Sequence, residues 1–379
     1  MLNDYTQFER YFRSKTEPLT AFQPDAQDEK THLYGVSLSS LFNLAAWTDG
    51  LQNAQGQKFN VLGGFIDSLL PNAVAERDDK NFYIGINNAL FVTINEFAMF
   101  CFAQKKFFPE IGEAKAESSP QPLDGYAPGL WLLQHTQSGG RVTDEHSRHL
   151  IPKCSTRYVQ SIYLAQLMTR FVWLHELAHC NNGHVSFVQD KKIADRIHEL
   201  DDGLQAAQLS RRGNKTNLKV LKLLEFDADG SALKASLRIQ TDGLENIDGI
   251  AKQALDTRID LALFAAYAMT WLFEEIQAYL DVRAGLTHPS PFNRLQNLFH
   301  ITSQHLGEHI PNIEDRRESA FKRFDTVRDA IPKIFCTEAI TSRLTDDIEI
   351  ARATQLNSKL EALRTRLQPF SFFSSPNES

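Results

Sequence analysis

Two histidines four residues apart, inside a largely apolar stretch, constrain the fold of this chain more than any other feature. The segment reads His175-Glu176-Leu177-Ala178-His179 and follows the apolar run Phe171-Val172-Trp173-Leu174. This pattern predicts a long helix that starts after Ser155-Thr156 and stops at Asn181-Asn182-Gly183. On a helix the two imidazoles project from one face, one turn apart, so they can bind a single metal ion.

The residue types at this spacing suit zinc and a general base. A catalytic zinc has three protein ligands, often histidines, and an open fourth position. Glu176 would stand beside the metal, where it can take a proton from a zinc-activated water. The alternative is a chance motif, with two structural histidines beside a surface glutamate. We expect one Zn²⁺ per chain, held in part by His175 and His179.

A third ligand is expected from the next strong helix, which the pattern places from about Asn217 to Arg238. Glu225 and Asp229 lie one turn apart there among apolar residues, and a partly buried carboxylate needs a partner. Glu225 would bind zinc, and Asp229 would accept a hydrogen bond from the far nitrogen of a ligand histidine. His184 is a weaker candidate for the metal because Gly183 is expected to end the first helix; we expect it just behind the ligands or on the substrate side.

The segment Thr287-His288-Pro289 introduces a further pair of candidate catalytic residues, His288 and Arg294. Pro289 and Pro291 favour a helix start after a rigid turn, which could hold His288 over the metal. There His288 could stabilise an oxyanion or occupy the open zinc position, and Arg294 could bind a carboxylate or a carbonyl. The alternative is an ordinary helix N-terminus with a surface histidine and a structural arginine.

Taken in order, these motifs resemble the gluzincin peptidases of the HtpX and CaaX-prenyl-protease type, over roughly residues 157–300. The resemblance consists of HExxH followed by His184, ExxxD from Glu225 to Asp229, and THP followed by Arg294. It implies a zinc metalloprotease in which Glu176 is the general base. Members often carry membrane helices or export signals, and this sequence shows neither. The chain also resembles phage-exclusion proteases of the Lit type, which cleave a host translation factor, so antiviral defence is an expected context.

Charge and hydropathy exclude several classes of partner. The formal net charge of -7 shows no basic excess, so we expect no nucleic-acid partner. The longest nearly apolar run, from Leu261 to Phe273, is shorter than the roughly 20 residues of a membrane-spanning helix. The polar N-terminus lacks a secretory signal, and the four cysteines form no CxxC pair. These features predict a cytoplasmic protein that does not bind membranes.

The chain is expected to adopt a mainly α (α+β) fold, with a zincin-like helical core and a small β-sheet. A short strand at Phe82–Ile86 is expected at a sheet edge, where it could pair with an extended substrate. Helices are expected over about 90–108 and 247–282, with a long loop or insertion at 109–150. The expected parts are an N-terminal region forming one wall of the cleft (1–150), the zinc peptidase core (151–310), C-terminal bracing helices (311–367) and a disordered tail (368–379).

The expected function is zinc-dependent hydrolysis of peptide bonds in a specific cytosolic protein. Because no export or anchor segment is visible, we expect activity to be restrained or triggered, for example by an activating or inhibitory protein. One alternative is a regulatory protease that cleaves a repressor. The other is a non-catalytic protein-binding domain with a structural zinc, in which His184 or His288 would be a permanent fourth ligand.

Overall fold

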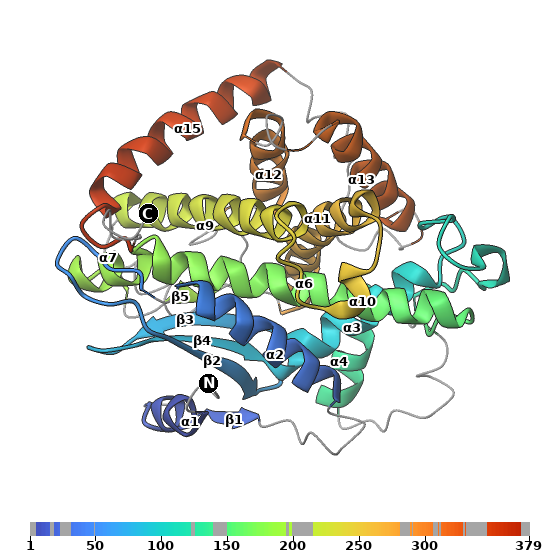
Figure 1. Ribbon diagram of the computed structural model, residues 1–379, viewed down its shortest axis with the longest axis horizontal. Coiled ribbons are helices and arrows are strands. Elements are labelled where there is room, and N and C mark those ends of the chain that lie inside the picture. Colours follow the sequence, from blue (N-terminus) through green and yellow to red (C-terminus); the bar gives the residue numbers. More distant parts are fainter. Residues whose placement is uncertain are drawn as a thin grey trace.

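The computed structural model of the protein (Figure 1) describes residues 5–15, 19–22, 32–48, 50–122, 126–138, 150–194, 197–198, 215–280, 289, 291–305, 310, 312–328, 330 and 347–372. Its helices are α1 (Tyr5–Arg13), α2 (His32–Ala45), η1 (Ala46–Thr48), α3 (Asn88–Phe102), η2 (Ala114–Ala116), α4 (Leu130–Gln137), α6 (Ser155–Asn181), α7 (His184–Asp190), α9 (Lys215–Thr241), α10 (Asp248–Ala251), α11 (Leu255–Tyr279), α12 (Pro291–His305), α13 (Ile313–Arg328) and α15 (Asp347–Leu367). Its strands are β1 (Thr20–Phe22), β2 (Val61–Asp67), β3 (Ala73–Arg77), β4 (Phe82–Asn87) and β5 (Ile197–His198). The predicted mainly α (α+β) fold is therefore confirmed.

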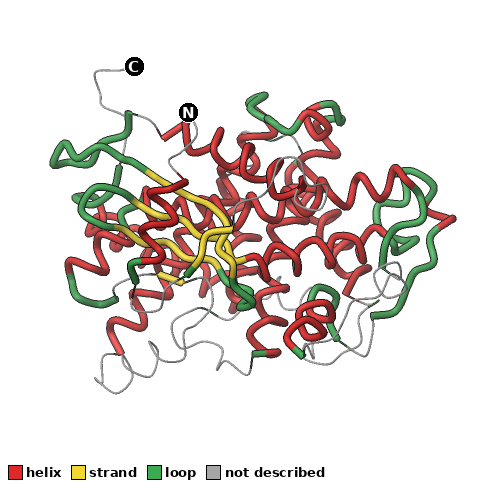
Figure 2. Tube along the Cα trace, turned by 90° about the horizontal axis from the view of Figure 1, so that it is seen from below, coloured by secondary structure: helices red, strands yellow, loops and turns green. Residues whose placement is uncertain are grey.

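The five strands form one mixed sheet in the order β1-β2-β4-β3-β5 (Figure 2). β2 and β4 are parallel, whereas β1 is antiparallel to β2, and β3 is antiparallel to both β4 and β5. β4 confirms the strand predicted at Phe82–Ile86, but the predicted edge position is wrong because β4 lies between β2 and β3. Phe82 and Ile84 enter one hydrophobic cluster and Tyr83 the other, as expected for a central strand that is buried on both faces.

Helices cover both faces of the sheet. On one face, Phe8 and Phe12 of α1 pack with Tyr83 in a small cluster, and Tyr11 stacks on Tyr83 with ring centroids 3.6 Å apart. On the other face, α3 and α6 pack against the strands and begin the main hydrophobic core. α6 consequently lies between the sheet and the helices α9 and α11 (Figure 1).

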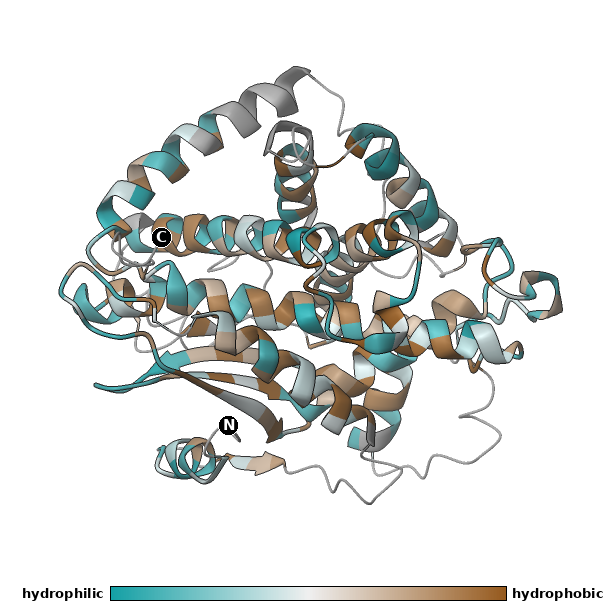
Figure 3. Ribbon diagram, viewed as in Figure 1, coloured by the Kyte–Doolittle hydropathy of each residue, from teal (hydrophilic) through white to brown (hydrophobic). Residues whose placement is uncertain are grey.

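α6 is a core helix along most of its 27 residues. Every residue from 164 to 180 is buried, and Figure 3 shows hydrophobic residues along it. A helix that is buried on all sides needs packing partners on each of its faces. Trp173 lies against Gly63 of β2, where any Cβ would overlap the indole ring. The glycine therefore lets the helix that carries both histidines approach the sheet closely.

The helices of the second half agree with the sequence patterns in most places. α6 and α9 confirm the two predicted long helices, and α12 begins after the THP segment as expected. The prediction of a single helix over 247–282 is wrong. The backbone at Ala254 is not helical (ψ 140°), and this break separates α10 from α11. The helix expected to reach Phe108 ends at Phe102, and Phe108 has a positive φ of 41° that no α-helix accommodates. The expected loop at 109–150 contains η2 and α4.

The end of α15 returns to the sheet and to the end of α6. The ring of Phe372 packs on Phe59 and Phe82, with centroids 4.9 and 5.4 Å apart. The backbone N–H of Phe372 donates to the carbonyl of Asn181 at 2.9 Å. The prediction of a disordered tail is therefore wrong for residues 368–372, since its aromatic side chains belong to the core. Residues 373–379 lie outside the described part of the chain.

Candidate metal centre

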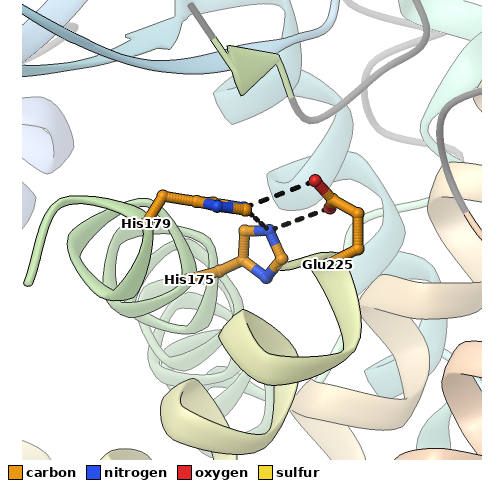
Figure 4. Close-up of side chains that lie close together, drawn as sticks. All are labelled: His175, His179 and Glu225. Carbon is orange, nitrogen blue, oxygen red and sulfur yellow. Dashed lines mark hydrogen bonds and ion pairs between the residues drawn. The ribbon is translucent and has the colours of Figure 1, made fainter. Parts of the chain in front are cut away.

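Helices α6 and α9 bring His175, His179 and Glu225 together (Figure 4). The Nε2 atoms of the two histidines lie 2.9 Å apart. Glu225 Oε2 is 3.3 Å from His175 Nε2, and Glu225 Oε1 is 3.5 Å from His179 Nε2. All three residues are buried. The ligand set predicted from the two motifs therefore converges on one point.

These distances are close to those between the ligand atoms of one shared metal ion. Nitrogen and oxygen ligands bind zinc at about 2.0–2.1 Å, so neighbouring ligands in a tetrahedron lie about 3.3 Å apart. The separations of 2.9, 3.3 and 3.5 Å bracket that value. The group can therefore hold a metal ion, and His175, His179 and Glu225 would be its protein ligands.

A carboxylate and an arginine stand behind His175. Its Nδ1 lies 3.0 Å from Asp229 Oδ1. Arg294 of α12 donates from Nε to Asp229 Oδ2 at 2.8 Å and from Nη2 to Oδ1 at 2.6 Å. Because the carboxylate can only accept, a hydrogen bond between the two residues would place the proton of His175 on Nδ1 and leave the Nε2 lone pair for the other ligands. Asp229 thus lies against the far nitrogen of His175, as expected from the sequence.

A longer chain of side chains stands behind His179. Its Nδ1 lies 3.0 Å from Nδ1 of His184, and Nε2 of His184 lies 3.1 Å from Asp227 Oδ2. Asp227 also accepts from Arg364 Nε at 2.7 Å and from Asn182 Nδ2 at 2.8 Å. Both ring nitrogens of His184 thus face His179 and Asp227, and the residue lies behind His179, one of its two expected positions.

The electrostatics of the group favour metal binding. Burial lowers the pKa of His179 to about 4, and the nearby Glu225 carboxylate offsets only part of this shift. Burial alone would raise the pKa of Asp229 and of Asp227, but cationic and hydrogen-bonding neighbours hold both below the usual value. At neutral pH Asp227 and Asp229 are charged and His179 is neutral, as a metal-binding histidine must be.

Glu176 is fully buried on α6, next to the first ligand histidine. Cys180 is also fully buried, and burial raises the pKa of its thiol well above the usual value. The cysteine is therefore a residue of the main hydrophobic core.

The remaining predicted catalytic residues have different outcomes. Thr287 and His288 lie outside the described residues, so the role of His288 stays a prediction. Arg294 binds a carboxylate, as expected, but it is 1 % exposed and contacts Asp229 rather than the converging ligand atoms. Arg294 therefore contacts His175 indirectly, through Asp229, and its catalytic role stays a prediction.

Sequence reasoning missed the part played by Arg364. Asp227 lies inside the ExxxD segment, but Arg364 is 137 residues further along the chain. Its neighbours in α15 form an ordinary charged helical pattern with no feature that marks a site. Only the docking of α15 brings this guanidinium to Asp227.

In the described parts of the chain, no helix is long and apolar enough to cross a membrane. No family model, curated protein or solved structure matches the sequence. The functional argument consequently depends on the residues of the metal centre and their chemistry.

Proposed function

We propose that this protein is a zinc-dependent endopeptidase of the gluzincin type. One observation carries the proposal: two imidazole Nε2 atoms and the Glu225 carboxylate converge within 2.9–3.5 Å, on helices that also carry the glutamate of an HExxH motif. Two histidines and one carboxylate are the ligand set of zinc peptidases, and zinc accepts this set in tetrahedral geometry. A bound zinc would act as a Lewis acid that polarises a peptide carbonyl and acidifies water near neutral pH.

Glu176 supplies the proton transfers in this proposal. Its carboxylate accepts the proton of the attacking water and delivers it to the departing amine. Burying a carboxylate costs free energy, and Glu176 is 0 % exposed. A role as general base gives a reason for keeping this carboxylate inside the core. His288 is proposed to assist at the oxyanion, as its sequence context suggests.

The burial of the centre supports restrained activity. The exposed fractions of His175, Glu176, His179 and Glu225 are 1, 0, 0 and 3 %. A peptide reaches such a centre only through a restricted path or after a movement of the surrounding chain. We therefore propose a specific protein substrate and control by an activating or inhibitory protein, with defence against phage in the cytoplasm as the setting.

The alternative of a purely structural zinc site needs a fourth protein ligand. His184 was the nearest candidate, and its two nitrogens are directed at His179 and Asp227. This arrangement argues against His184 as a fourth ligand, and so supports the enzyme over a binding domain in which His184 closes the site. A protease that cleaves a repressor would use the same centre and differs only in its substrate.

The test compares the purified wild type with Glu176→Gln in proteins from a host lysate. We expect about one zinc per chain in both and new protein N-termini only with the wild type. Chelation should stop cleavage, and added zinc should restore it. If the zinc-loaded wild type cuts nothing, with or without extract from infected cells, the structural-zinc alternative replaces the enzyme. Broad cleavage of casein without an activator would contradict the proposed restraint.

A further inference from the structure

We infer that His184, Asp227 and Arg364 position the His179 ring for metal binding, so that the C-terminal helix α15 is a working part of the metal centre. The inference rests on the proposed zinc site and extends it to a segment far away in sequence. Arg364 and Asp227 are 137 residues apart, yet Arg364 Nε lies 2.7 Å from Asp227 Oδ1.

The hydrogen bonds along this chain of side chains have one consistent direction. The Asp227 carboxylate only accepts, so the proton of a neutral His184 is on Nε2. Nδ1 of His184 is then an acceptor and faces Nδ1 of His179, which must donate. The remaining lone pair of His179 is therefore on Nε2, the atom that points to His175 and Glu225. The chain selects the tautomer of His179 that can bind a metal.

Asp227 is held from two directions. Oδ2 accepts from Asn182 Nδ2 at 2.8 Å as well as from His184, while Oδ1 accepts from Arg364. Asp227 is 2 % exposed, whereas the Arg364 side chain is 43 % exposed. The carboxylate is thus fixed inside the protein, and the arginine reaches it from the surface helix α15 (Figure 1).

The residues that follow Arg364 bind the C-terminal end of α6, close to His179. Ser371 Oγ donates to the carbonyl of Asn182 at 2.8 Å, and the N–H of Phe372 donates to that of Asn181 at 2.9 Å. Gly183 has a left-handed φ of 80°, and a Cβ there would overlap Phe370. Residues 370–372 therefore hold the turn between His179 and His184 in place. This fixes the position of one imidazole relative to the other.

The two ligand histidines are supported by analogous but unequal arrangements. His175 meets a carboxylate directly, and that carboxylate binds the buried Arg294. His179 meets its carboxylate through a second imidazole, and the arginine behind it is partly exposed. The support of His179 is consequently the part of the centre that depends on the docking of the C-terminal helix.

The experiment measures zinc affinity of the full-length protein by competition with a chromophoric chelator, and the visible spectrum of the cobalt-substituted protein. Asp227→Asn is expected to weaken zinc binding by about 10- to 100-fold and to shift the cobalt absorption bands, because His184 loses the carboxylate that fixes which of its nitrogens faces His179. Arg364→Ala is expected to weaken binding by about 2- to 10-fold, since water can reach its position. Arg364→Lys keeps a cation beside Asp227 and should restore most of the affinity.

Arg366→Ala is the matched control. Arg366 comes from the same turn of α15 and lies over the ring of Phe187 at 5.2 Å, on α7. It should leave zinc affinity and the cobalt spectrum unchanged, and an equal loss with Arg366→Ala and Arg364→Ala would overturn the assignment of Arg364.

A folded Asp227→Asn protein with wild-type affinity and spectrum would overturn the inference. If that variant does not fold, His184→Gln carries the same expectation and the same consequence. The wild type is measured first: failure of the wild type to bind zinc would refute the proposed metal centre itself, and the inference with it. Zinc binding that is unchanged across the variants refutes the inference alone.

Discussion

Arg294 holds Asp229 with two hydrogen bonds, from Nε to Oδ2 at 2.8 Å and from Nη2 to Oδ1 at 2.6 Å. Neither residue is more than 1 % exposed. The pair lies directly behind His175, whose Nδ1 is 3.0 Å from Asp229 Oδ1. Arg294, on α12, thus fixes the orientation of the His175 ring on α6 through the Asp229 carboxylate, although Arg294 and Asp229 are 65 residues apart in the chain.

Arg294→Ala should destabilise the protein strongly. The substitution leaves the Asp229 carboxylate buried without its cation, and breaking such a pair costs about 3–5 kcal/mol. The free energy of unfolding in urea measures the loss. Lys322→Ala is the comparison, because its ion pair with Glu318 is exposed, at 74 and 65 %, and should change stability little. Equal losses in the two variants would contradict the role assigned to the buried pair.

Glu225→Gln should lose stoichiometric zinc, whereas Glu176→Gln should keep it. Both changes replace a buried carboxylate by an amide of the same shape, so packing is matched. Only Glu225 lies within ligand distance of both histidines, at 3.3 and 3.5 Å from their Nε2 atoms. Zinc content after dialysis measures the difference. Equal zinc in the two variants would remove Glu225 from the ligand set.

Gly63→Ala should weaken the packing of α6 on β2. Its Cβ would overlap the ring of Trp173, and forcing a methyl group into a filled core costs about 1–3 kcal/mol. At Gly35, within α2, a Cβ meets nothing within 4 Å. Gly35→Ala should therefore stabilise the protein by about 0.4–1 kcal/mol. Urea unfolding of both variants tests the opposite signs, and a neutral Gly63→Ala would show that the indole relocates without cost.

Deprotonation of Glu96 should lower the free energy of unfolding as the pH rises. Burial raises its pKa from 4.5 to about 7, although the N–H groups of Leu132 and Gly129 oppose the shift. The folded state therefore binds the proton more tightly than the unfolded state. The stabilisation from the protonated Glu96 is complete below pH 4.5 and is lost as the pH rises to about 7. The free energy of unfolding changes by about 3 kcal/mol over this range.

Glu96→Gln should remove this dependence because the amide does not titrate. The difference in unfolding free energy between Glu96→Gln and wild type should therefore shift in favour of the variant from pH 4.5 to 8. Taking the difference cancels the titration of groups shared by the two proteins. A difference that stays constant over this range would mean that Glu96 does not carry the proton.

The parts of the centre that follow from local spacing were predictable from sequence. His175 and His179 share a helix face because they are four residues apart, and Glu225 and Asp229 share another for the same reason. Their apolar neighbours indicated burial, and the convergence of Glu225 on the two histidines agrees with that interpretation. Helical spacing, apolar neighbours and the HExxH and ExxxD motifs together led to these four assignments.

The parts that depend on tertiary contacts were not predictable. The central position of β4 requires β2 and β3 on either side, and its alternation was instead interpreted as an edge strand. Phe372 lies in a short polar tail by composition, yet it packs on Phe59 and Phe82. Arg364 reaches Asp227 only because α15 returns across the molecule. No short-range pattern encodes these contacts.

Anomalous X-ray diffraction at the zinc edge, from crystals of the wild-type protein, tests the central claim most directly. The account predicts one peak per chain, within about 2.0–2.2 Å of His175 Nε2, His179 Nε2 and a Glu225 carboxylate oxygen, with the fourth position not filled by a protein side chain. A peak at another site, or a zinc whose fourth ligand is His184 or His288, would contradict it.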